Sequence, residues 1–398
     1  MKSWMGRIAL SAVAAAAFAG STALKADMSP VKVSGYAIGD YYWIAQSNTL
    51  GKSGMPGEGY SGQSGWDFRR IYISLDQNLD DAFSWETRLE LDGGDFTGNN
   101  GGTSSTTLIQ PYLKTAFLKW KYMDGEYAWF GLNVTPEFDF VEGQWGYRSV
   151  EKTPLDLQGW SISVDQGVGL MGSLGMPGLS YEAVVGNGTG QKALAGGLSG
   201  VNDPKTGVGK EFAASITYQP MDMLVAQVEG NYDNSVTDGG FANPDAYKYL
   251  LGAFVELKSD MGRLGLQYDQ RDAVDGTPAQ AGKNGAARQE LVSAFLVGNI
   301  LDNLSFYARM DQLLWEPNPT DGDNLFNLGT ASQYIEQATG YYNTTAILGL
   351  DYKASANVHF EPNVEVVSYE AQKSGGAGAN WGVPSQDVIP RLTMYVTY

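Results

Sequence analysis

The chain is 398 residues long and carries 44 acidic against 26 basic side chains, a formal net charge of −18. It contains no Cys and a single His, His359, which excludes disulfides, thiolate nucleophiles, Cys-ligated metals and multi-histidine metal sites. A chain this acidic offers no basic surface to nucleic acid, so no nucleic-acid partner is expected.

The first 26 residues have the composition of a Sec-type signal peptide. Two basic residues supply the positive charge, an apolar run follows from Ile8 to Gly20, and small residues come next. That run of about 13 residues is too short to span a bilayer as a helix. We expect residues 1–26 to be removed on export by cleavage after Ala26, with Ala19 and Ala23 as alternative cleavage positions.

From residue 31 onward the chain repeats one unit, a run of about 10–14 residues in which apolar and polar side chains alternate. Alternation with period two places the apolar side chains on one face of a β-strand and the polar side chains on the other. Breaks rich in Gly, Asn, Asp or Pro separate the runs. Sixteen strands are expected, at 31–46, 66–78, 81–91, 111–122, 126–134, 159–172, 178–187, 208–219, 222–233, 245–258, 261–271, 287–299, 302–314, 340–353, 356–370 and 386–398.

The connections between these runs alternate between short and long. Short turns such as Leu79-Asp80 and Ser259-Asp260 are followed by long polar segments such as 92–110 and 272–286. A barrel with one rim facing outward and the other facing the periplasm has this pattern. A soluble β-sandwich, the main alternative, has no reason to segregate its loops by length. We therefore predict that residues 27–398 form a transmembrane antiparallel β-barrel of about 16 strands, with long extracellular loops and short periplasmic turns.

The chain ends in an alternating strand, QDVIPRLTMYVTY, whose final residue is the aromatic Tyr398. Such a strand resembles the closing strand of Gram-negative outer-membrane β-barrel proteins, although that family usually ends in Phe. The resemblance implies location in the cell outer membrane, contact with its lipid and lipopolysaccharide, and recognition of this strand by the barrel assembly machinery. Aromatic residues at strand ends, Trp66 and Trp160 among them, are expected to form girdles at the membrane boundaries.

The third long connection, residues 134–158, differs from the other loops in its apolar content. Its Phe, Trp, Tyr, Val and Leu side chains could pack against the inner wall, and a short helix is expected over Ser149–Lys152, before Pro154. Sixteen strands enclose a channel too wide for wall side chains to fill. We therefore expect this loop to fold into the lumen and to constrict it, with Glu137, Asp139, Glu142, Arg148, Glu151, Lys152 and Asp156 as its charged residues.

Charged residues are also expected on the lumen face of the wall. Two interpretations stay open: the bases oppose the acidic loop and create a transverse field, or they pair with wall acids and only keep the lumen wet. Strand 287–299 is ambiguous, because both of its faces are apolar in the middle. The pore-wall candidates are Arg70, Glu86, Arg88, Glu90, Lys119, Lys121, Arg309 and Arg391.

The whole layout resembles the sixteen-stranded porins of Gram-negative outer membranes. Residues 66–96 and the following PYLKTAFLKWKY are similar to the phosphate-selective porin O/P group, in which an Arg-bearing strand precedes a W-x-x-x-x-E-x-D strand. The resemblance implies a water-filled diffusion channel, a homotrimer and an inward-folded third loop. Phosphate selectivity would require a lysine-rich constriction, whereas this loop has five acids against two bases. We therefore expect a weak preference for cations.

The sequence offers no catalytic constellation. A Ser–His nucleophile could use only His359, which is expected to face the lumen, so we predict no enzyme, no catalytic residue, no cofactor and no metal. The alternatives to a cation-preferring porin are an anion- or phosphate-selective porin, a non-conducting structural or adhesive barrel, and a soluble β-rich periplasmic protein.

Overall fold

The computed structural model describes residues 28–47, 61–92, 111–188, 190, 210–234, 237–238, 241–242, 247–274, 286–316, 341–371 and 386–398. The expected signal peptide lies outside these residues and stays a prediction. None of the helices in the described ranges is long and apolar enough to cross a membrane.

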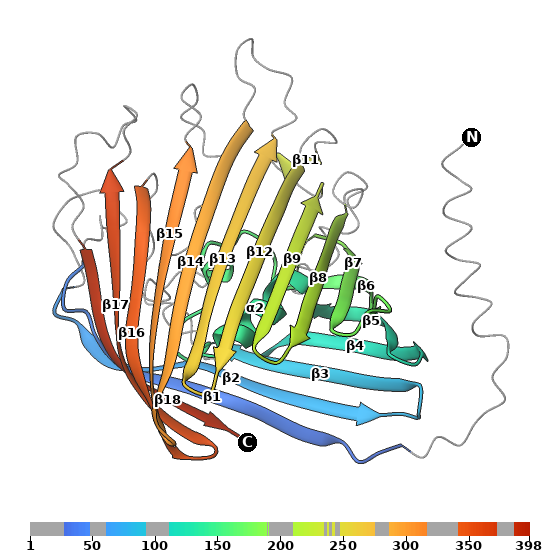
Figure 1. The fold of residues 1–398 in the computed structure, drawn as a ribbon, viewed down its shortest axis with the longest axis horizontal. Helices are drawn as coiled ribbons and strands as arrows, with labels where there is room; N and C mark the ends of the chain where they lie inside the picture. The colour runs from blue at the N-terminus through green and yellow to red at the C-terminus, as the bar shows by residue number, and fades with distance from the viewer. Residues whose placement is uncertain are drawn as a thin grey trace, which may run out of the picture.

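Sixteen strands form one closed antiparallel barrel in which neighbours in space are neighbours in sequence (Figure 1). This confirms the predicted fold. The strands are β1 (Lys32–Trp43), β2 (Ser64–Asn78), β3 (Phe83–Asp92), β4 (Pro111–Met123), β5 (Glu126–Val134), β6 (Val164–Ser173), β7 (Leu179–Gly186), β8 (Glu211–Met221), β9 (Leu224–Asp233), β12 (Tyr247–Ser259), β13 (Gly262–Val274), β14 (Ala286–Leu301), β15 (Leu304–Glu316), β16 (Tyr341–Ser355), β17 (Val358–Ala371) and β18 (Gln386–Thr397).

The last strand closes the barrel against the first, as its sequence predicts. β18 pairs with β1 from Tyr36↔Thr397 to Tyr42↔Arg391. Gly35 and Tyr398 exchange two backbone hydrogen bonds of 3.0 Å each. Closure leaves no edge of the barrel sheet without a partner, which is the condition for a sheet to stand in lipid.

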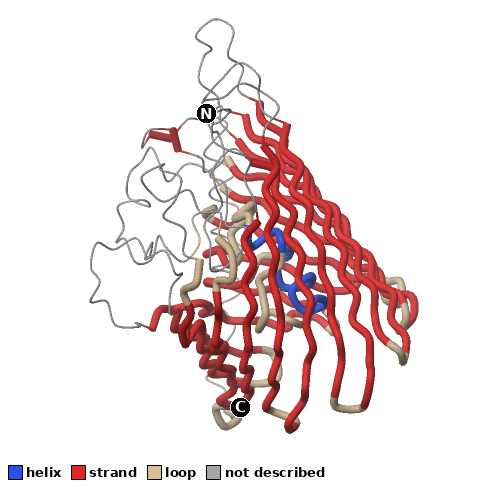
Figure 2. The backbone as a smooth tube through the Cα atoms, turned by 90° about the vertical axis from the view of Figure 1, so that its left-hand side faces the viewer, coloured by secondary structure: helices blue, strands red, loops and turns tan. Residues whose placement is uncertain are grey.

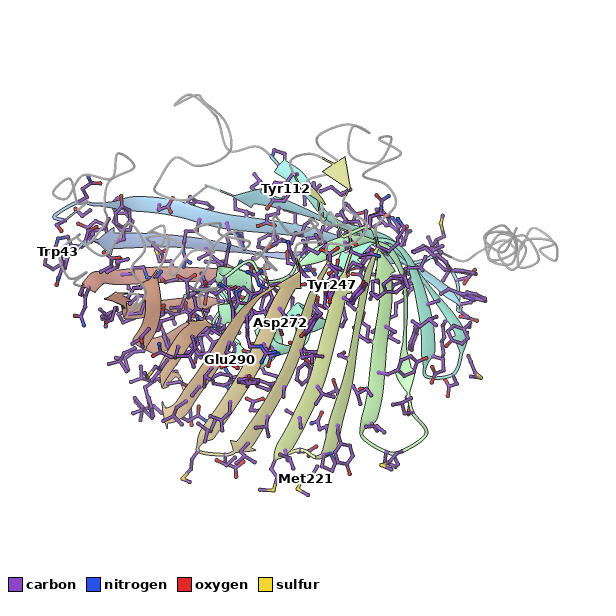
Figure 3. The ribbon with its side chains drawn as sticks, turned by 90° about the horizontal axis from the view of Figure 1, so that it is seen from above. Trp43, Tyr112, Met221, Tyr247, Asp272 and Glu290 are labelled. Carbon is purple, nitrogen blue, oxygen red and sulfur yellow. The ribbon has the colours of Figure 1, made fainter. Side chains whose placement is uncertain are left out.

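The side chains alternate between the outer face and the lumen. On β13, Leu264 and Leu266 are exposed on the outside, whereas Gln267, Asp269 and Arg271 are buried inside. An apolar outer band around a polar interior is the pattern of a barrel wall that faces lipid. Figure 3 shows the rings of Tyr112 and Tyr247 at the strand ends that carry the long loops, with Met221 at the opposite ends. We call these two ends the long-loop rim and the short-turn rim.

A β-bulge on β2 turns two consecutive arginines into the lumen. The register shifts between Ile38 and Gly39, which pair with Arg70 and Phe68 and leave Arg69 as the extra residue. Both arginines are buried inside the barrel. A bulge inserts one residue and so reverses which alternate positions face inward. Strict alternation places only Arg70 inside, because it does not anticipate the bulge.

Two helices lie inside the barrel wall, α2 (Pro136–Trp145) and α3 (Pro154–Leu157) (Figure 2). The third long loop is therefore folded into the lumen, as predicted. Helix α2 follows Thr135, which is extended, and has Pro136 in its first turn. Gly146 caps the C-terminal end of the helix, and its φ of 71° is left-handed. The prediction of a helix over Ser149–Lys152 is wrong, because that stretch forms a turn and then a non-helical segment that precedes α3.

Other parts of the layout also differ from the sequence predictions. β6 begins at Val164 and not at residue 159, so the loop runs five residues beyond its expected end, to Ser163. Trp160, expected in an aromatic girdle, therefore lies in the loop and is buried. Two short strands not anticipated from the sequence, β10 (Thr237–Asp238) and β11 (Phe241–Ala242), pair with each other outside the barrel sheet.

Candidate pore lining

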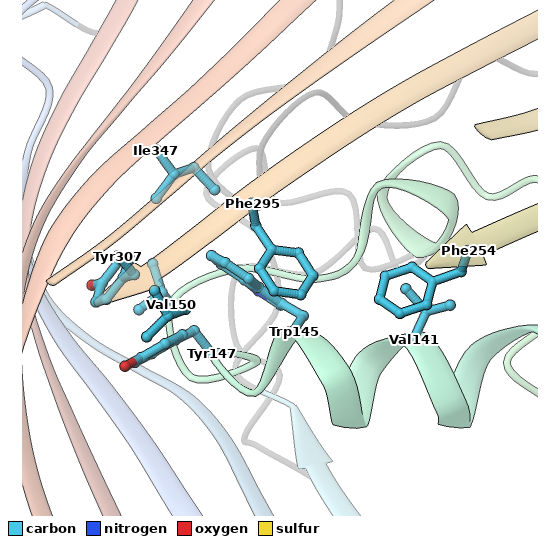
Figure 4. Packing of buried hydrophobic residues seen from close by; sticks show 9 residues of the cluster. Val141, Trp145, Tyr147, Val150, Phe254, Phe295, Tyr307 and Ile347 are labelled. Carbon is cyan, nitrogen blue, oxygen red and sulfur yellow. The ribbon is translucent and has the colours of Figure 1, made fainter. Parts of the chain in front are cut away.

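The loop packs one side against an apolar patch on the inner wall, which we call the apolar seat. The seat is formed by Phe254, Phe295, Val297, Tyr307 and Ile347 from β12, β14, β15 and β16. Loop residues Val141, Trp145, Tyr147 and Val150 pack against it (Figure 4). The inward apolar residues of β14, which made the strand ambiguous in sequence, are explained by this contact.

Trp145, the last residue of α2, lies at the centre of this packing and is 1% exposed. Its ring centroid is 5.4 Å from that of Phe295 and 6.1 Å from that of Tyr307. The Arg309 guanidinium lies 4.8 Å from the ring, and the indole Nε1 donates to the Glu151 carbonyl at 3.1 Å. Aromatic edge and cation contacts of this kind add to the burial energy.

A second apolar cluster holds the two ends of the loop against the same side of the wall. Phe138 of α2, Leu155 of α3 and Trp160 pack with Leu250, Leu291 and Leu313 of β12, β14 and β15. Arg271 of β13 lies 5.2 Å from the Trp160 ring. The loop is therefore fixed along its whole length and not only at its tip.

Buried ion pairs tie the loop to the closing strands. Arg391 of β18 contacts Glu365 at 2.7 Å and Glu151 of the loop at 3.5 Å, and all three side chains are fully buried. Arg69 of β2 pairs with Asp40 and donates to the Val150 carbonyl at 3.1 Å. Each guanidinium neutralises wall acids and also satisfies groups of the loop.

At the C-terminal end of α2, Arg263 of β13 donates to the backbone carbonyls of Gln144 and Trp145. The hydrogen bond to Trp145 is 2.9 Å long. A Cβ on Gly146 would lie 2.7 Å from Arg263 Nη2, and the left-handed backbone there also favours glycine. Lys258 of β12 donates to Gln144 Oε1 at 2.6 Å. These contacts hold the C-terminal carbonyls of the helix.

The opposite side of the loop is polar and faces the wall formed by β2, β3 and β4. Asp139 is exposed within the barrel, and Glu142 retains 35% of its side-chain surface. Arg148 pairs with Glu142 at 3.0 Å and with Asp156 at 3.6 Å. Enclosure and then the Asp156 carboxylate raise the pKa of Glu142 to about 7, while Arg70 opposes the shift.

Basic side chains oppose these acids from the wall, and each lies beside a wall acid. Arg70 pairs with Glu90 at 2.8 Å, and Lys114 reaches the same carboxylate at 3.4 Å. Arg88 lies 3.7 Å from Glu86. Enclosure raises the pKa of Asp139 on the loop, and the Arg88 charge opposes that shift. Both interpretations of the wall therefore hold in part: the bases have wall partners and also face the acidic loop.

The structure thus divides the predicted site residues into groups. Four charged loop residues face five charged wall residues across the lumen. The loop residues are Asp139, Glu142, Arg148 and Asp156, and the wall residues are Arg70, Glu86, Arg88, Glu90 and Lys119. Four others, Glu137, Glu151, Arg309 and Arg391, are buried where the loop meets the wall. Lys121 pairs with Asp124 at the short-turn rim, and Lys152 is half-buried after Glu151.

Glu137 shows why an acidic loop residue need not face water. It is 1% exposed, and its carboxylate accepts from Ser161 and, at 3.0 Å, from Asn231 of β9. Burial raises the pKa of Glu137, and these hydrogen bonds oppose the shift. It anchors the first turn of α2.

Strict alternation missed the lumen residues Arg69 and Lys114. Both lie at register shifts, the second between Arg88 and Leu89, which pair with Thr115 and Leu113. A signal was present on β2: the outward apolar positions change from even at Trp66 and Phe68 to odd at Ile71 and Ile73, so one residue had to be extra.

No family model matches the chain, and no curated protein matches it in sequence. Solved structures match its fold over nearly the whole length. An anion-selective porin from Comamonas acidovorans has a TM-score of 0.64 at 8% identity and covers 94% of this chain and 100% of its own. OmpT of Vibrio cholerae in its trimer form scores 0.57 at 11% identity, with 93% and 99% covered. The outer membrane channel DcaP of Acinetobacter baumannii scores 0.56 at 12%, with 95% and 100% covered.

The fold is that of a sixteen-stranded outer-membrane porin. The sequence-based resemblance to porins is confirmed at this level. The finer likeness to the phosphate-selective O/P group stays a prediction, because no family model matches.

Proposed function

We propose that the protein is an outer-membrane porin that forms a water-filled channel for passive diffusion of small hydrophilic solutes and ions. One observation carries the proposal: Asp139 is solvent-exposed although it belongs to α2, which lies inside the closed barrel (Figure 2). The aqueous path runs between the polar side of the loop and the wall of β2, β3 and β4. Its two sides carry opposite charge, so an ion crosses a transverse field.

We propose a weak preference for cations. The whole chain has a net charge of −18, and the loop presents Asp139, Glu142 and Asp156 to the path. The preference is weak because Arg88, Lys114 and Lys119 face these acids, and because salt screens charges beyond about 8–10 Å. The basic wall supports the second candidate, an anion-selective channel, and the Comamonas acidovorans porin is anion-selective.

The reversal potential in a KCl gradient across a planar bilayer separates these candidates. Wild type should favour potassium slightly, and the triple change Asp139→Asn, Glu142→Gln and Asp156→Asn should move the reversal potential toward chloride. The matched control neutralises three exposed acids at the short turns, Asp81, Asp222 and Asp302. It should shift the reversal potential much less. A wild-type channel that already favours chloride would overturn the cation preference but not the pore.

We also propose a homotrimer in the outer membrane, since one structure with the same fold is a trimer form. Contact with lipopolysaccharide and recognition of the strand ending at Tyr398 by the barrel assembly machinery belong to the same proposal. Light scattering of the protein in mild detergent should give the mass of a trimer. A monomer mass in every mild detergent would count against the proposed trimer.

A further inference from the structure

Three side chains with metal-ligand atoms meet on the lumen face of β16 and β17, near the short-turn rim. Tyr352 pairs with Phe360 and Gly349 with Asn363, which places Asp351 opposite Glu361. His359 lies two residues before Glu361 and so on the same face. One ligand atom from each of Asp351, His359 and Glu361 lies within 4.8 Å of the other two.

The two carboxylates are buried side by side with little compensating charge. Asp351 is 3% exposed and Glu361 2%. His359 Nδ1 lies 2.8 Å from Asp351 Oδ1. The Arg69 charge acts on Glu361, but Arg69 is itself paired with Asp40. Two carboxylates desolvated together repel each other unless one takes up a proton or a cation joins them.

One carboxylate oxygen of this group is buried without a hydrogen-bond partner among the described residues. Glu361 Oε1 accepts a hydrogen bond of 3.0 Å from Ser149 Oγ. The other oxygen, Oε2, has no hydrogen-bond donor within the part of the chain that the structure describes. A buried carboxylate oxygen of this kind is a ready ligand atom.

We propose that Asp351, His359 and Glu361 bind one divalent transition-metal cation of the Zn²⁺ class. A cation there cancels both buried charges, and an imidazole ligand favours Zn²⁺ over Mg²⁺ or Ca²⁺, which prefer oxygen ligands alone. Ligands about 2.1 Å from zinc lie at most about 4.2 Å apart. Side-chain movements of less than about 1 Å would therefore bring the three ligand atoms to zinc-binding distance.

The proposed site is joined to the loop that lines the channel. Ser149 donates to Glu361, and the Tyr147 hydroxyl interacts with the Asp351 carboxylate. Hydrogen bonds to metal ligands orient them, so these two loop residues form the outer shell of the site. A bound cation would fix the loop tip as well as the wall, and the bound protein should unfold at a higher temperature.

The test uses tag-free protein, folded in detergent and stripped with a chelator. Titration with Zn²⁺ by calorimetry should show one saturable site per chain. His359→Gln and Glu361→Gln should each weaken Zn²⁺ binding at least about tenfold. Glu229→Gln is the matched control, because Glu229 is buried beside Asp269 in an acidic pair that has no histidine, and its binding should equal that of wild type.

A second measurement needs no variant. The chain has one histidine, so protein labelled with ¹⁵N-histidine shows a single imidazole. Its ring signals should move to one new position as Zn²⁺ saturates the site, and a hundredfold excess of Mg²⁺ should not reverse the change. Imidazole signals that do not move, or the absence of saturable Zn²⁺ binding, would overturn the proposal. So would wild-type affinity in the His359→Gln variant, or loss of binding in the Glu229→Gln control.

Discussion

At the scale of single residues, buried ion pairs fix the loop. Arg391 neutralises Glu151 of the loop and Glu365 of the wall, and it also donates to Asn363 at 2.9 Å. Pairs like these contribute little net stability when formed from solvated groups. Removing one partner is different, because the remaining charges stay buried.

The first prediction follows from that asymmetry. Arg391→Met leaves two buried carboxylates without their shared cation and should reduce the free energy of unfolding by about 3–5 kcal/mol. The measurement is the temperature at which the compact form is lost on SDS gels. Lys121→Met is the matched control, since its partner Asp124 is solvent-exposed, and it should leave that temperature unchanged. Equal temperatures for both variants would contradict the buried network.

The second prediction concerns Glu142. Its raised pKa of about 7 means that it loses its negative charge as the pH falls through neutrality. Cation preference should therefore be weaker at pH 6 than at pH 8, as measured by the reversal potential in a KCl gradient. Glu142→Gln should remove most of this pH dependence, and a variant that keeps the full dependence would show that another group is responsible.

Residue positions on the wall were predictable from alternation except where the alternation breaks. Glu86, Arg88 and Glu90 face the lumen, as the period of two requires. Arg69 and Lys114 were missed, because a bulge adds one residue and reverses the pattern locally. His359 was predicted to face the lumen. Its proximity to Asp351 depends on the register of two strands, which spacing along the chain does not specify.

At the scale of elements, the apolar seat decides where the loop lies. Helix α2 is short, and an isolated helix of ten residues is marginal in water. Its stability must come from the burial of Phe138, Val141 and Trp145 against the wall. The loop is therefore part of the barrel interior and not an independent flap.

The third prediction tests that dependence. Trp145→Ala removes the central ring of the packing and should weaken the loop's attachment by about 3–5 kcal/mol, the usual range for a buried Trp. Trypsin should then cut the folded barrel at Arg148 or Lys152, where wild type resists. Trp66→Ala is the control, because that ring is 72% exposed at the long-loop rim. Wild-type resistance in Trp145→Ala would mean that the polar anchors alone hold the loop.

Element prediction from sequence succeeded where periodicity is strong. All sixteen expected runs overlap the sixteen barrel strands. The helix was misplaced, although Thr135-Pro136 followed by two acids in the first turn is a helix start that the sequence contains. The predicted strand 287–299, which is β14 in the structure, looked ambiguous because its inward apolar face meets a loop and not water. Packing against a segment distant in sequence leaves no periodic signal.

At the scale of the whole molecule, the account predicts one aqueous path through a closed wall. Acids on one side of this path and bases on the other produce the field, and the apolar seat keeps the loop from blocking the basic side. The alternative of a non-conducting barrel would require the loop to fill the lumen, although Asp139 is exposed inside it.

The absence of Cys allows the path to be tested directly. Asp139→Cys places a thiol on the exposed side of α2, and Val141→Cys places one on the side packed against Phe254. Single-channel current in a planar bilayer is recorded before and after a bulky water-soluble thiol reagent is added. We predict that the Asp139→Cys current falls on modification while the Val141→Cys current does not change. A wild-type protein that never conducts, or an Asp139→Cys current that is unaffected although mass spectrometry shows the label, would contradict the account.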